Sequence, residues 1–269
     1  MGQLILLVDG LNTTLDCDVI FLARVAQAVY DLYMSSKDTQ PVPVSSIGLL
    51  RETSLHAALK AWYAQDGDRI EFLVDGYVID IVREGLLIEI QTRGFSSLKA
   101  KLVRLTQSHP VRLVHPIAQE KWVVRISADG HTTLARRRSP RHGRVEYIFK
   151  ELVRFPALVK EPNFSIEVLL TQEEEIWQDD GKGSWRRKGW SIADHHLLNV
   201  VGSIVLADPQ DFCALLPPGL PQPFTTSDLA QALPVPRSLA QKMVYCLKEM
   251  GVLEGVGKIG RSNLYRLIA

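Results

Sequence analysis

Three short apolar runs over residues 69–92 are separated by single glycines. The runs are RIEFLVDG, YVIDIVREG and LLIEIQT, and Gly76 and Gly85 lie between them. β-Branched and aliphatic residues bounded by turn-forming glycines are typical of strands joined by tight hairpins. The pattern therefore predicts a meander of three short strands.

An amphipathic helix is predicted on each side of this meander, over residues 51–68 and 95–109. Thr53 or Ser54 can cap the first helix and Ser96 the second. The inward positions are Leu55, Ala58, Leu59 and Trp62 in the first helix and Leu98, Leu102 and Leu105 in the second. Strands at VRLVHPI and KWVVRIS follow, so residues 51–127 read helix, three strands, helix, strand, strand. This order predicts an α/β fold with a mixed sheet.

The middle of the chain continues the mixed pattern up to a proline-rich segment. The predicted elements are a basic loop at TTLARRRSPRHGR, a helix at VEYIFKELVRFPALV, strands at FSIEVLLTQEEEIWQDD and LLNVVGSIVLADP, and a short helix at PQDFCALLP. The segment LPPGLPQPF is typical of a linker. The predicted division is an N-terminal extension over 1–50, a domain over 51–216, a linker over 217–224 and a second domain over 225–269.

The last 45 residues predict helix, turn, helix and hairpin. Thr226 or Ser227 can cap the first helix, PVP forms the turn, and Gly251 follows the second helix. The expected buried positions are Leu229, Leu233, Leu239, Met243, Leu247 and Met250.

The first 50 residues allow two interpretations. In one, residues 4–8 form a strand and residues 19–33 a helix; in the other, translation starts at Met34 and residues 1–33 do not belong to the natural protein. A signal peptide is not expected, because Asp9, Asp16 and Asp18 interrupt the apolar runs. No function is assigned to this segment.

Composition narrows the class of protein only slightly. A formal net charge of +1 means that any nucleic-acid interface must be a local basic patch. The three cysteines are far apart and form neither a zinc motif nor a disulfide framework. No stretch is long and apolar enough to span a membrane, and a cytoplasmic protein is expected.

Two carboxylates interrupt the apolar meander. Asp80 and Glu89 each lie between two isoleucines on neighbouring predicted strands. Since side chains alternate along a strand, both acids can point to the face opposite the isoleucines and converge. Converging carboxylates repel unless a cation lies between them, and Mg²⁺ or Mn²⁺ suits oxygen ligands. Glu52 is a further candidate ligand, although its charge at a helix start also suits the helix dipole. Glu71 is expected to be an exposed edge residue.

This arrangement resembles the PD-(D/E)xK nuclease superfamily, whose restriction-endonuclease-like core has the same element order. The resemblance covers residues 51–127, and extends to about residue 175 at most. It implies that Asp80 and Glu89 bind Mg²⁺ or Mn²⁺ for phosphodiester hydrolysis. The family lysine is replaced by Gln91, which can orient water but carries no charge. Lys99 or Lys101, on the following helix, is expected to supply that charge.

The C-terminal pattern resembles a winged helix-turn-helix domain, which implies contact with the major groove of DNA. The resemblance places the DNA-facing positions of the second helix at Arg237, Ser238, Gln241, Lys242 and Tyr245, and those of the wing at Lys258 and Arg261. In the segment GKGSWRRKGW, Arg186, Arg187 and Lys188 are further candidates because tryptophans flank them. The arginine-rich segment at 136–144 suits either phosphate contact or simple solvation.

Three functions remain open. The favoured one is a metal-dependent DNA endonuclease, and the second is a non-catalytic DNA-binding or regulatory protein on a degenerate nuclease fold. The third is a protein-interaction adaptor. DNA is the expected partner, no membrane is expected, and a homodimer is left open.

Overall fold

The computed structural model describes residues 53–268. The strand and helix predicted within residues 1–50, and the candidate ligand Glu52, lie outside the described residues. Within the described part, no helix is both long and apolar enough to cross a membrane.

The predicted meander is present as β1 (Arg69–Val74), β2 (Tyr77–Arg83) and β3 (Leu86–Ile90), joined by antiparallel pairing. Gly76 and Gly85 take positive φ values of +82° and +88° in the two connecting turns. Only glycine adopts that conformation without steric cost, so these two residues set the positions of both hairpins.

Helix α2 (Ser54–Tyr63) is capped by Thr53, whose side-chain oxygen accepts the His56 N–H. The predicted cap is therefore confirmed, but one predicted core residue is wrong. Trp62 is exposed, while Tyr63 is buried with Leu55 and Leu59. Residues four apart share one helix face, and the buried face follows the series Leu55, Leu59, Tyr63.

Helix α3 (Lys99–Leu105) follows the 3-10 turn η1 (Phe95–Ser97), and its three predicted leucines are buried. The predicted Ser96 cap is wrong, because Ser96 lies inside η1 and no side chain of this segment caps it. Instead, the Glu151 carboxylate accepts the Phe95 N–H at 3.3 Å. A distant acid thus satisfies a donor at the start of this segment.

Long strands form the centre of the sheet. The two strands predicted between residues 111 and 127 are one strand, β4 (Val111–Ile126), with a bulge between Ala118 and Glu120. It pairs in parallel with β6 (Phe164–Gln178), which in turn pairs antiparallel with β7 (Ser191–Leu206). The predicted basic loop contains strand β5 (Thr133–Arg138), which pairs with the far half of β4.

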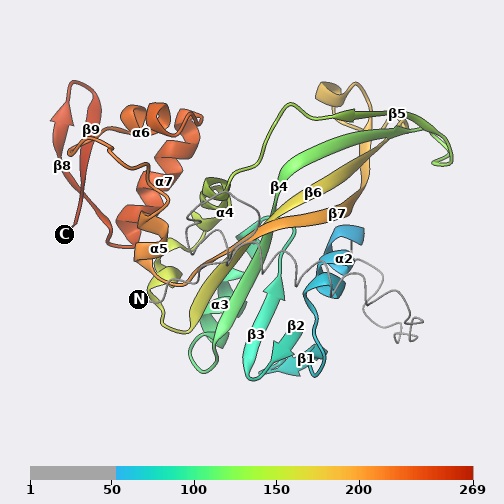
Figure 1. The fold of residues 1–269 in the computed structure, drawn as a ribbon, viewed down its shortest axis with the longest axis horizontal. Coiled ribbons are helices and arrows are strands. Elements are labelled where there is room, and N and C mark those ends of the chain that lie inside the picture. Colours follow the sequence, from blue (N-terminus) through green and yellow to red (C-terminus); the bar gives the residue numbers. More distant parts are fainter. Residues whose placement is uncertain (1–52, 269) are drawn as a thin grey trace, which may run out of the picture. The chain divides into compact units, whose positions relative to one another are not determined.

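The sheet order is β1-β2-β3-β4-β6-β7, with β5 on β4, and it mixes parallel and antiparallel pairs. The fold is therefore α+β with one large mixed sheet (Figure 1). The remaining elements are η2 (Val145–Ile148), α4 (Phe149–Leu152), η3 (Pro156–Lys160), η4 (Trp185–Arg187), α5 (Pro209–Cys213), α6 (Thr226–Ala232), α7 (Arg237–Glu249), β8 (Leu253–Ile259) and β9 (Ser262–Leu267).

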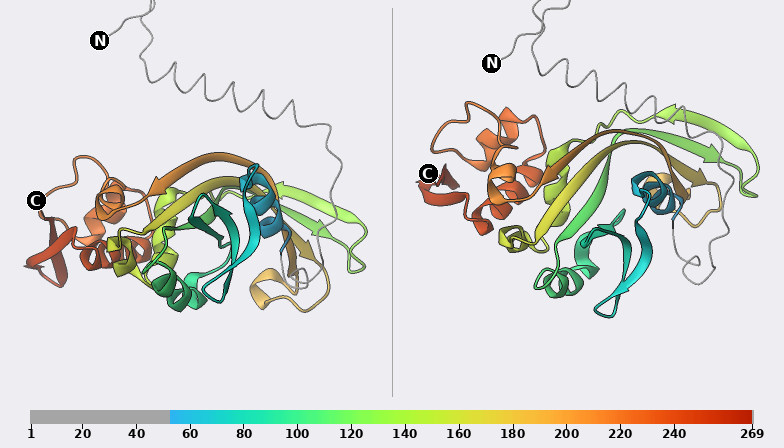
Figure 2. Two further views of the ribbon diagram at one scale, coloured as in Figure 1. Left: turned by 90° about the horizontal axis from the view of Figure 1, so that it is seen from below. Right: turned by 60° about the horizontal axis from the view of Figure 1, so that its bottom comes forward.

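Helices cover both faces of the sheet, and each face has its own buried cluster. On one face, α2 packs against Ile88, Ile90 and Val114, on the concave side of the curved strands (Figure 2). On the other face, α3, α4 and α7 contribute to a larger cluster that includes Leu113 and Ile166. Strands β2 and β3 are therefore enclosed between α2 and α3, which places Asp80 and Glu89 between two layers.

The C-terminal elements follow the predicted order of helix, turn, helix and hairpin. Thr225, rather than Thr226 or Ser227, caps α6, because it forms a reciprocal capping box with Asp228. All six predicted apolar positions of α6 and α7 are buried. Gly251 has φ +80° directly after α7, as expected for a helix-ending glycine.

Candidate functional site

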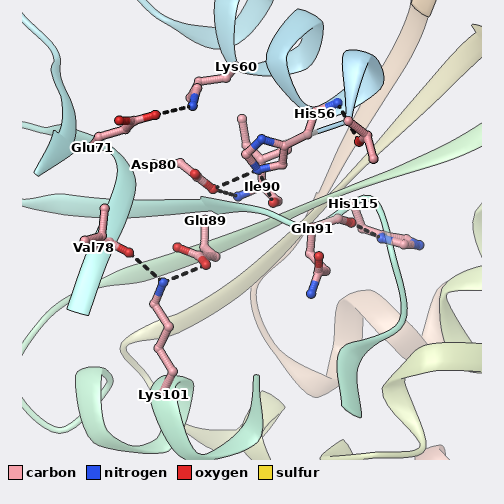
Figure 3. Close-up of polar contacts among 11 residues, drawn as sticks. His56, Lys60, Glu71, Val78, Asp80, Glu89, Ile90, Gln91, Lys101 and His115 are labelled. Carbon is pink, nitrogen blue, oxygen red and sulfur yellow. Dashed lines mark hydrogen bonds and ion pairs between the residues drawn. The ribbon is translucent and has the colours of Figure 1, made fainter. Parts of the chain in front are cut away.

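Asp80 and Glu89 lie on adjacent strands, each one residue beyond the last pair of the β2–β3 ladder. The pairing of β2 with β3 sets Ile81 opposite Ile88, and continuing this register sets Asp80 opposite Glu89. The Asp80 carboxylate also accepts the N–H of Ile90, the residue after Glu89, at 2.8 Å. Figure 3 shows the two carboxylates between the basic side chains of α2 and Lys101 of α3.

Asp80 is held in its ionised form. Burial alone would raise its pKa, but the hydrogen bond and charge of His56, the Ile90 N–H and the charge of Lys60 together outweigh burial, so its pKa lies below the usual value. The His56 Nε2 lies 3.4 Å from Asp80 Oδ2 and 2.9 Å from the Ile90 carbonyl oxygen. His56 therefore ties α2 to both strands at the position of Asp80.

Glu89 is in a different electrostatic state. Burial raises its pKa first, the neighbouring Asp80 charge raises it further, and Lys101 lowers it only in part. Lys101 donates to Glu89 Oε1 at 2.6 Å and to the Val78 carbonyl at 2.8 Å. The second carboxylate oxygen, Oε2, is buried and has no hydrogen-bond partner within the described part of the chain. A buried acceptor without a partner is costly and needs an explanation.

Gln91 follows Glu89 by two positions, where the nuclease resemblance expects a lysine. Its amide makes one long hydrogen bond, 3.5 Å to the Gly94 carbonyl, so the side chain is only loosely held. Its backbone is fixed more firmly, because the His115 imidazole lies 2.5 Å from the Gln91 carbonyl oxygen. Burial lowers the pKa of His115, which keeps the ring neutral, with its Nδ1–H as the donor.

The two candidate lysines have different surroundings. Lys101 contacts Glu89, whereas Lys99 is exposed and lines a groove of about 420 Å³ with Arg154 and Tyr245. On the other side of Asp80, Glu71 is exposed on edge strand β1 and pairs with Lys60 at 2.8 Å. The charge expected beside Gln91 is thus available from Lys101.

The donor chemistry fits a hard divalent cation in part. Within residues 53–268, no cluster of three or more ligating side chains is arranged around a metal position. Mg²⁺, however, keeps several waters and is usually bound through one or two carboxylates. Asp80 offers an ionised carboxylate, and Glu89 offers an oxygen that has no partner among residues 53–268. These two residues therefore match the minimal protein ligand set of Mg²⁺.

The basic segments predicted to contact DNA lie on two parts of the molecule. Arg186, Arg187 and Lys188 lie in the β6–β7 loop, where the Arg187 Nε donates to the Trp190 carbonyl at 3.1 Å. The predicted arginine-rich loop is in part wrong, because Arg136 and Arg138 belong to strand β5 and pair with Glu174 and Glu120. Pairing with β4 supplies the hydrogen bonds that a loop would lack.

The candidate DNA-facing residues of α7 have mixed exposure. Arg237, Ser238 and Gln241 are exposed, as are Lys258 and Arg261 of the hairpin. Lys242 instead donates to the Lys150 carbonyl of α4 at 3.2 Å, and Tyr245 lines the groove beside η3. The first turns of α7 and the hairpin are therefore open to a ligand, whereas the middle of α7 faces the rest of the fold.

Sequence reasoning did not identify His56. His56 lies on α2 and contacts Asp80 on β2. The two elements are separated along the chain by β1, and no local motif links the two residues. The one available signal is its spacing, since His56 and Lys60 are four apart and so share one face of α2. Both are basic, and both influence the pKa of Asp80.

Comparison with known proteins gives two matches. Residues 53–207 match the family described as Domain of unknown function (DUF8091). A protein of Treponema pallidum (strain Nichols), described as an uncharacterized protein, is 32% identical over 228 residues, which cover 82% of this chain and 87% of the relative. That share exceeds residues 53–207, so the likeness extends beyond the family domain. No solved structure matches the chain.

Proposed function

The chain belongs to the DUF8091 family, and we propose that it is a metal-dependent nuclease that hydrolyses phosphodiester bonds in DNA. The observation that carries this proposal is the state of Glu89. Its carboxylate is buried beside Asp80, one oxygen binds Lys101, and the other has no partner among the described residues. A structural acid would satisfy both oxygens, whereas a cation ligand would leave one available.

The element order supports the resemblance to the PD-(D/E)xK core. Helix α2, strands β1 to β3, helix α3 and strand β4 follow one another in that order, and the acids lie on the second and third strands. Asp80 and Glu89 are then the ligands of the catalytic metal. When bound, Mg²⁺ would polarise the phosphate and lower the pKa of its bound water.

The chain's own residues would divide the remaining work. The Lys101 ammonium, 2.6 Å from Glu89, is close enough to stabilise negative charge on a phosphate oxygen. Gln91 has an amide free enough to orient a water molecule. His56 holds Asp80 ionised and aligned with β3. The acid pair would then have a basic side chain on each side, His56 next to Asp80 and Lys101 next to Glu89.

The C-terminal elements would contribute to DNA binding as a winged helix. The element order, the buried face of α7 and the exposed residues Arg237, Gln241, Lys258 and Arg261 support this part of the proposal. The position of Lys242 against α4 favours contact through the start of α7 and the wing.

The second candidate is a DNA-binding protein without catalysis, and the observation that favours it is Gln91 in the lysine position together with the Lys101–Glu89 ion pair. In this ion pair the Lys101 ammonium neutralises the Glu89 carboxylate without any metal. The two functions therefore differ in whether Asp80 and Glu89 bind a divalent cation.

Cleavage of DNA by the purified full chain tests the proposal. The wild-type protein should nick plasmid DNA with Mg²⁺ or Mn²⁺ and stop with a chelator. Asp80→Asn keeps the side-chain volume but removes the charge, so it should reduce cleavage by about two orders of magnitude or more. Asp66→Asn, an exposed acid after α2, is the matched control and should cleave normally. Wild-type protein that neither cleaves nor binds a divalent ion by calorimetry would refute the nuclease proposal.

A further inference from the structure

The far end of the sheet, beyond the bulge in β4, concentrates the tryptophans of the chain. We refer to residues 120–138 and 173–196 as the distal arm, which comprises β5 and the adjoining parts of β4, β6 and β7. Four of the five tryptophans lie in it, namely Trp122, Trp177, Trp185 and Trp190. Arginine side chains lie over all four rings.

Arg125 is the least satisfied basic residue of this arm. Its guanidinium lies 5.9 Å from the Trp177 ring centre and 5.1 Å from that of Trp190. Its Nε–H is buried and has no hydrogen-bond acceptor among residues 53–268. A buried, charged donor without an acceptor is costly, and a phosphate oxygen is the acceptor that a guanidinium matches best.

Trp185 differs from Arg125 because its large aromatic ring is exposed to solvent. It is 83% exposed in the β6–β7 loop, compared with 51% for Trp62 on α2, and the Arg186 guanidinium lies 5.6 Å from its centre. An exposed tryptophan beside a cation is a stacking surface for an aromatic ligand. The ring and the nearby cations suit a nucleobase with its phosphate.

The charges of the arm separate into two groups. Arg136, Arg138 and Lys121 are neutralised by Glu174, Glu120 and Glu175. By contrast, Arg137, Arg186 and Lys188 form no ion pair within the described part of the chain. Arg125, Lys182 and Arg187 also form none among the described residues, so these six cations of the arm are left for an anionic ligand.

The arm is linked directly to the acid pair. Ser54 at the start of α2 donates to Asp194 of β7, and His56, two residues later, contacts Asp80. Asp194 pairs with Ile176, next to Trp177, which pairs with Arg125. Strands are about 4.8 Å apart, so Arg125 lies roughly 10 Å across the sheet from the row of Asp194. A ligand on the arm can therefore continue toward Asp80.

We propose that the distal arm binds single-stranded DNA, with a phosphate on Arg125 and an unpaired base on Trp185. The inference rests on the proposed nuclease function and specifies its substrate as DNA with a single-stranded segment. Base faces are stacked inside a duplex and are available to a tryptophan only in a single strand. The arm therefore selects unpaired DNA, and the acid pair would act on the strand that it holds.

Binding of the full chain to labelled DNA tests this proposal. Fluorescence anisotropy would compare a 20-nucleotide oligothymidylate with a 20-base-pair duplex at low salt, in chelator so that no cleavage occurs. The single strand should bind more tightly than the duplex. Trp185→Ala should weaken single-strand binding about tenfold, which is typical for loss of one stacked base. Trp62→Ala removes another exposed tryptophan and should change it less than about twofold.

A second variant examines the phosphate contact. Arg125→Lys keeps the charge but removes the planar Nε donor, so it should weaken single-strand binding about three- to tenfold. Circular dichroism would verify that each variant is folded. Equal binding of the Trp185 and Trp62 variants, or a duplex bound as tightly as the single strand, would overturn the proposal. Absence of binding to either DNA would do so too, and would favour a protein partner for Trp185.

The same assay separates this proposal from the nuclease proposal. Asp66→Asn, an exposed acid outside both the arm and the acid pair, should bind the single strand as tightly as the wild-type protein. If wild-type protein binds the single strand but cleaves no DNA, the arm proposal stands and the nuclease proposal fails. If it cleaves duplex DNA without preference for the single strand, the reverse holds.

Discussion

Carboxylates with little exposure occur at two places in this sheet, and they differ in how their oxygens are used. On β6, Glu167 accepts hydrogen bonds from Tyr63 and Ser203, one on each oxygen, at 2.6 and 2.5 Å. Glu175 likewise accepts from Lys121 and Trp177. On β3, Glu89 has Lys101 on one oxygen and no partner among the described residues on the other.

This difference separates two uses of a buried acid. A carboxylate with both oxygens satisfied holds neighbouring strands and helices together, and its loss leaves donors unpaired. A carboxylate with an idle oxygen beside a second acid stabilises little by itself, and its raised pKa reflects an unfavourable charge. Under the proposed function, such a group is left for a ligand, and divalent cations are the ligands that two carboxylates attract.

The largest expected effect is on stability at β6. Glu167→Ala would leave the buried Tyr63 hydroxyl without an acceptor and the Arg112 guanidinium without its ion-pair partner, at a cost of about 2–4 kcal/mol. For a folded unit of this size, the melting temperature should fall by roughly 5–15 °C. Differential scanning calorimetry would measure it, with Glu89→Gln as the comparison. If Glu89→Gln destabilised the fold as strongly, the distinction between the two acids would be wrong.

A smaller effect is expected from metal binding. At a concentration tenfold above the dissociation constant, Mg²⁺ would stabilise the fold by about 1.4 kcal/mol, a shift of roughly 3–5 °C. Asp80→Asn and Glu89→Gln should both lose this shift, and Glu175→Gln should keep it. Thermal unfolding with and without Mg²⁺ measures all four proteins. Equal shifts in the wild-type protein and Asp80→Asn would place the metal elsewhere.

The sequence predicted the local parts of the fold and missed the parts that depend on distant pairing. Gly76 and Gly85 determine their hairpins by backbone conformation alone, so β1 to β3 were predictable. The continuity of β4 through Ala118 and Glu120 depends on β6, about 50 residues away, which supplies the hydrogen bonds. Strand β5 was predicted as a loop for the same reason, because within the described part of the chain it pairs with β4 alone.

The candidate site divides in the same way. The placement of Asp80 and Glu89 on neighbouring strands follows from one tight turn, which the sequence contains. The choice between Lys99 and Lys101 depends on how α3 docks on the sheet, and only the structure places Lys101 on Glu89. His56 reaches Asp80 through the packing of α2, so no nearby residue could have indicated it.

The third prediction concerns pH. The pKa of Glu89 is raised above its ordinary value by burial and by the Asp80 charge, so the stability it contributes is present below the unfolded pKa and is lost as pH rises through the folded pKa. The wild-type protein should therefore lose stability relative to Glu89→Gln as pH rises through that range. Asp80, with a lowered pKa, behaves oppositely, so its contribution is lost only as pH falls below its usual range. Denaturant unfolding at several pH values measures both trends. If the difference in free energy of unfolding between the wild-type protein and Glu89→Gln were the same at every pH, the raised pKa of Glu89 would be contradicted.

The smallest effect on stability is expected at Gln91, where the nuclease and the degenerate interpretations differ most. Its side chain makes one long hydrogen bond to Gly94, so Gln91→Lys should change the free energy of unfolding by less than about 0.5 kcal/mol. The new ammonium would lie two positions from Glu89, on the side that faces Lys101. If the site is catalytic, the introduced ammonium adds to Lys101 a second positive charge that stabilises negative charge on the phosphate, so cleavage should be preserved or increased. Gln91→Glu is the matched control, since it places a third negative charge there and should reduce cleavage. Activity that falls with lysine and is unchanged with glutamate would mean that Gln91 does not face the scissile phosphate.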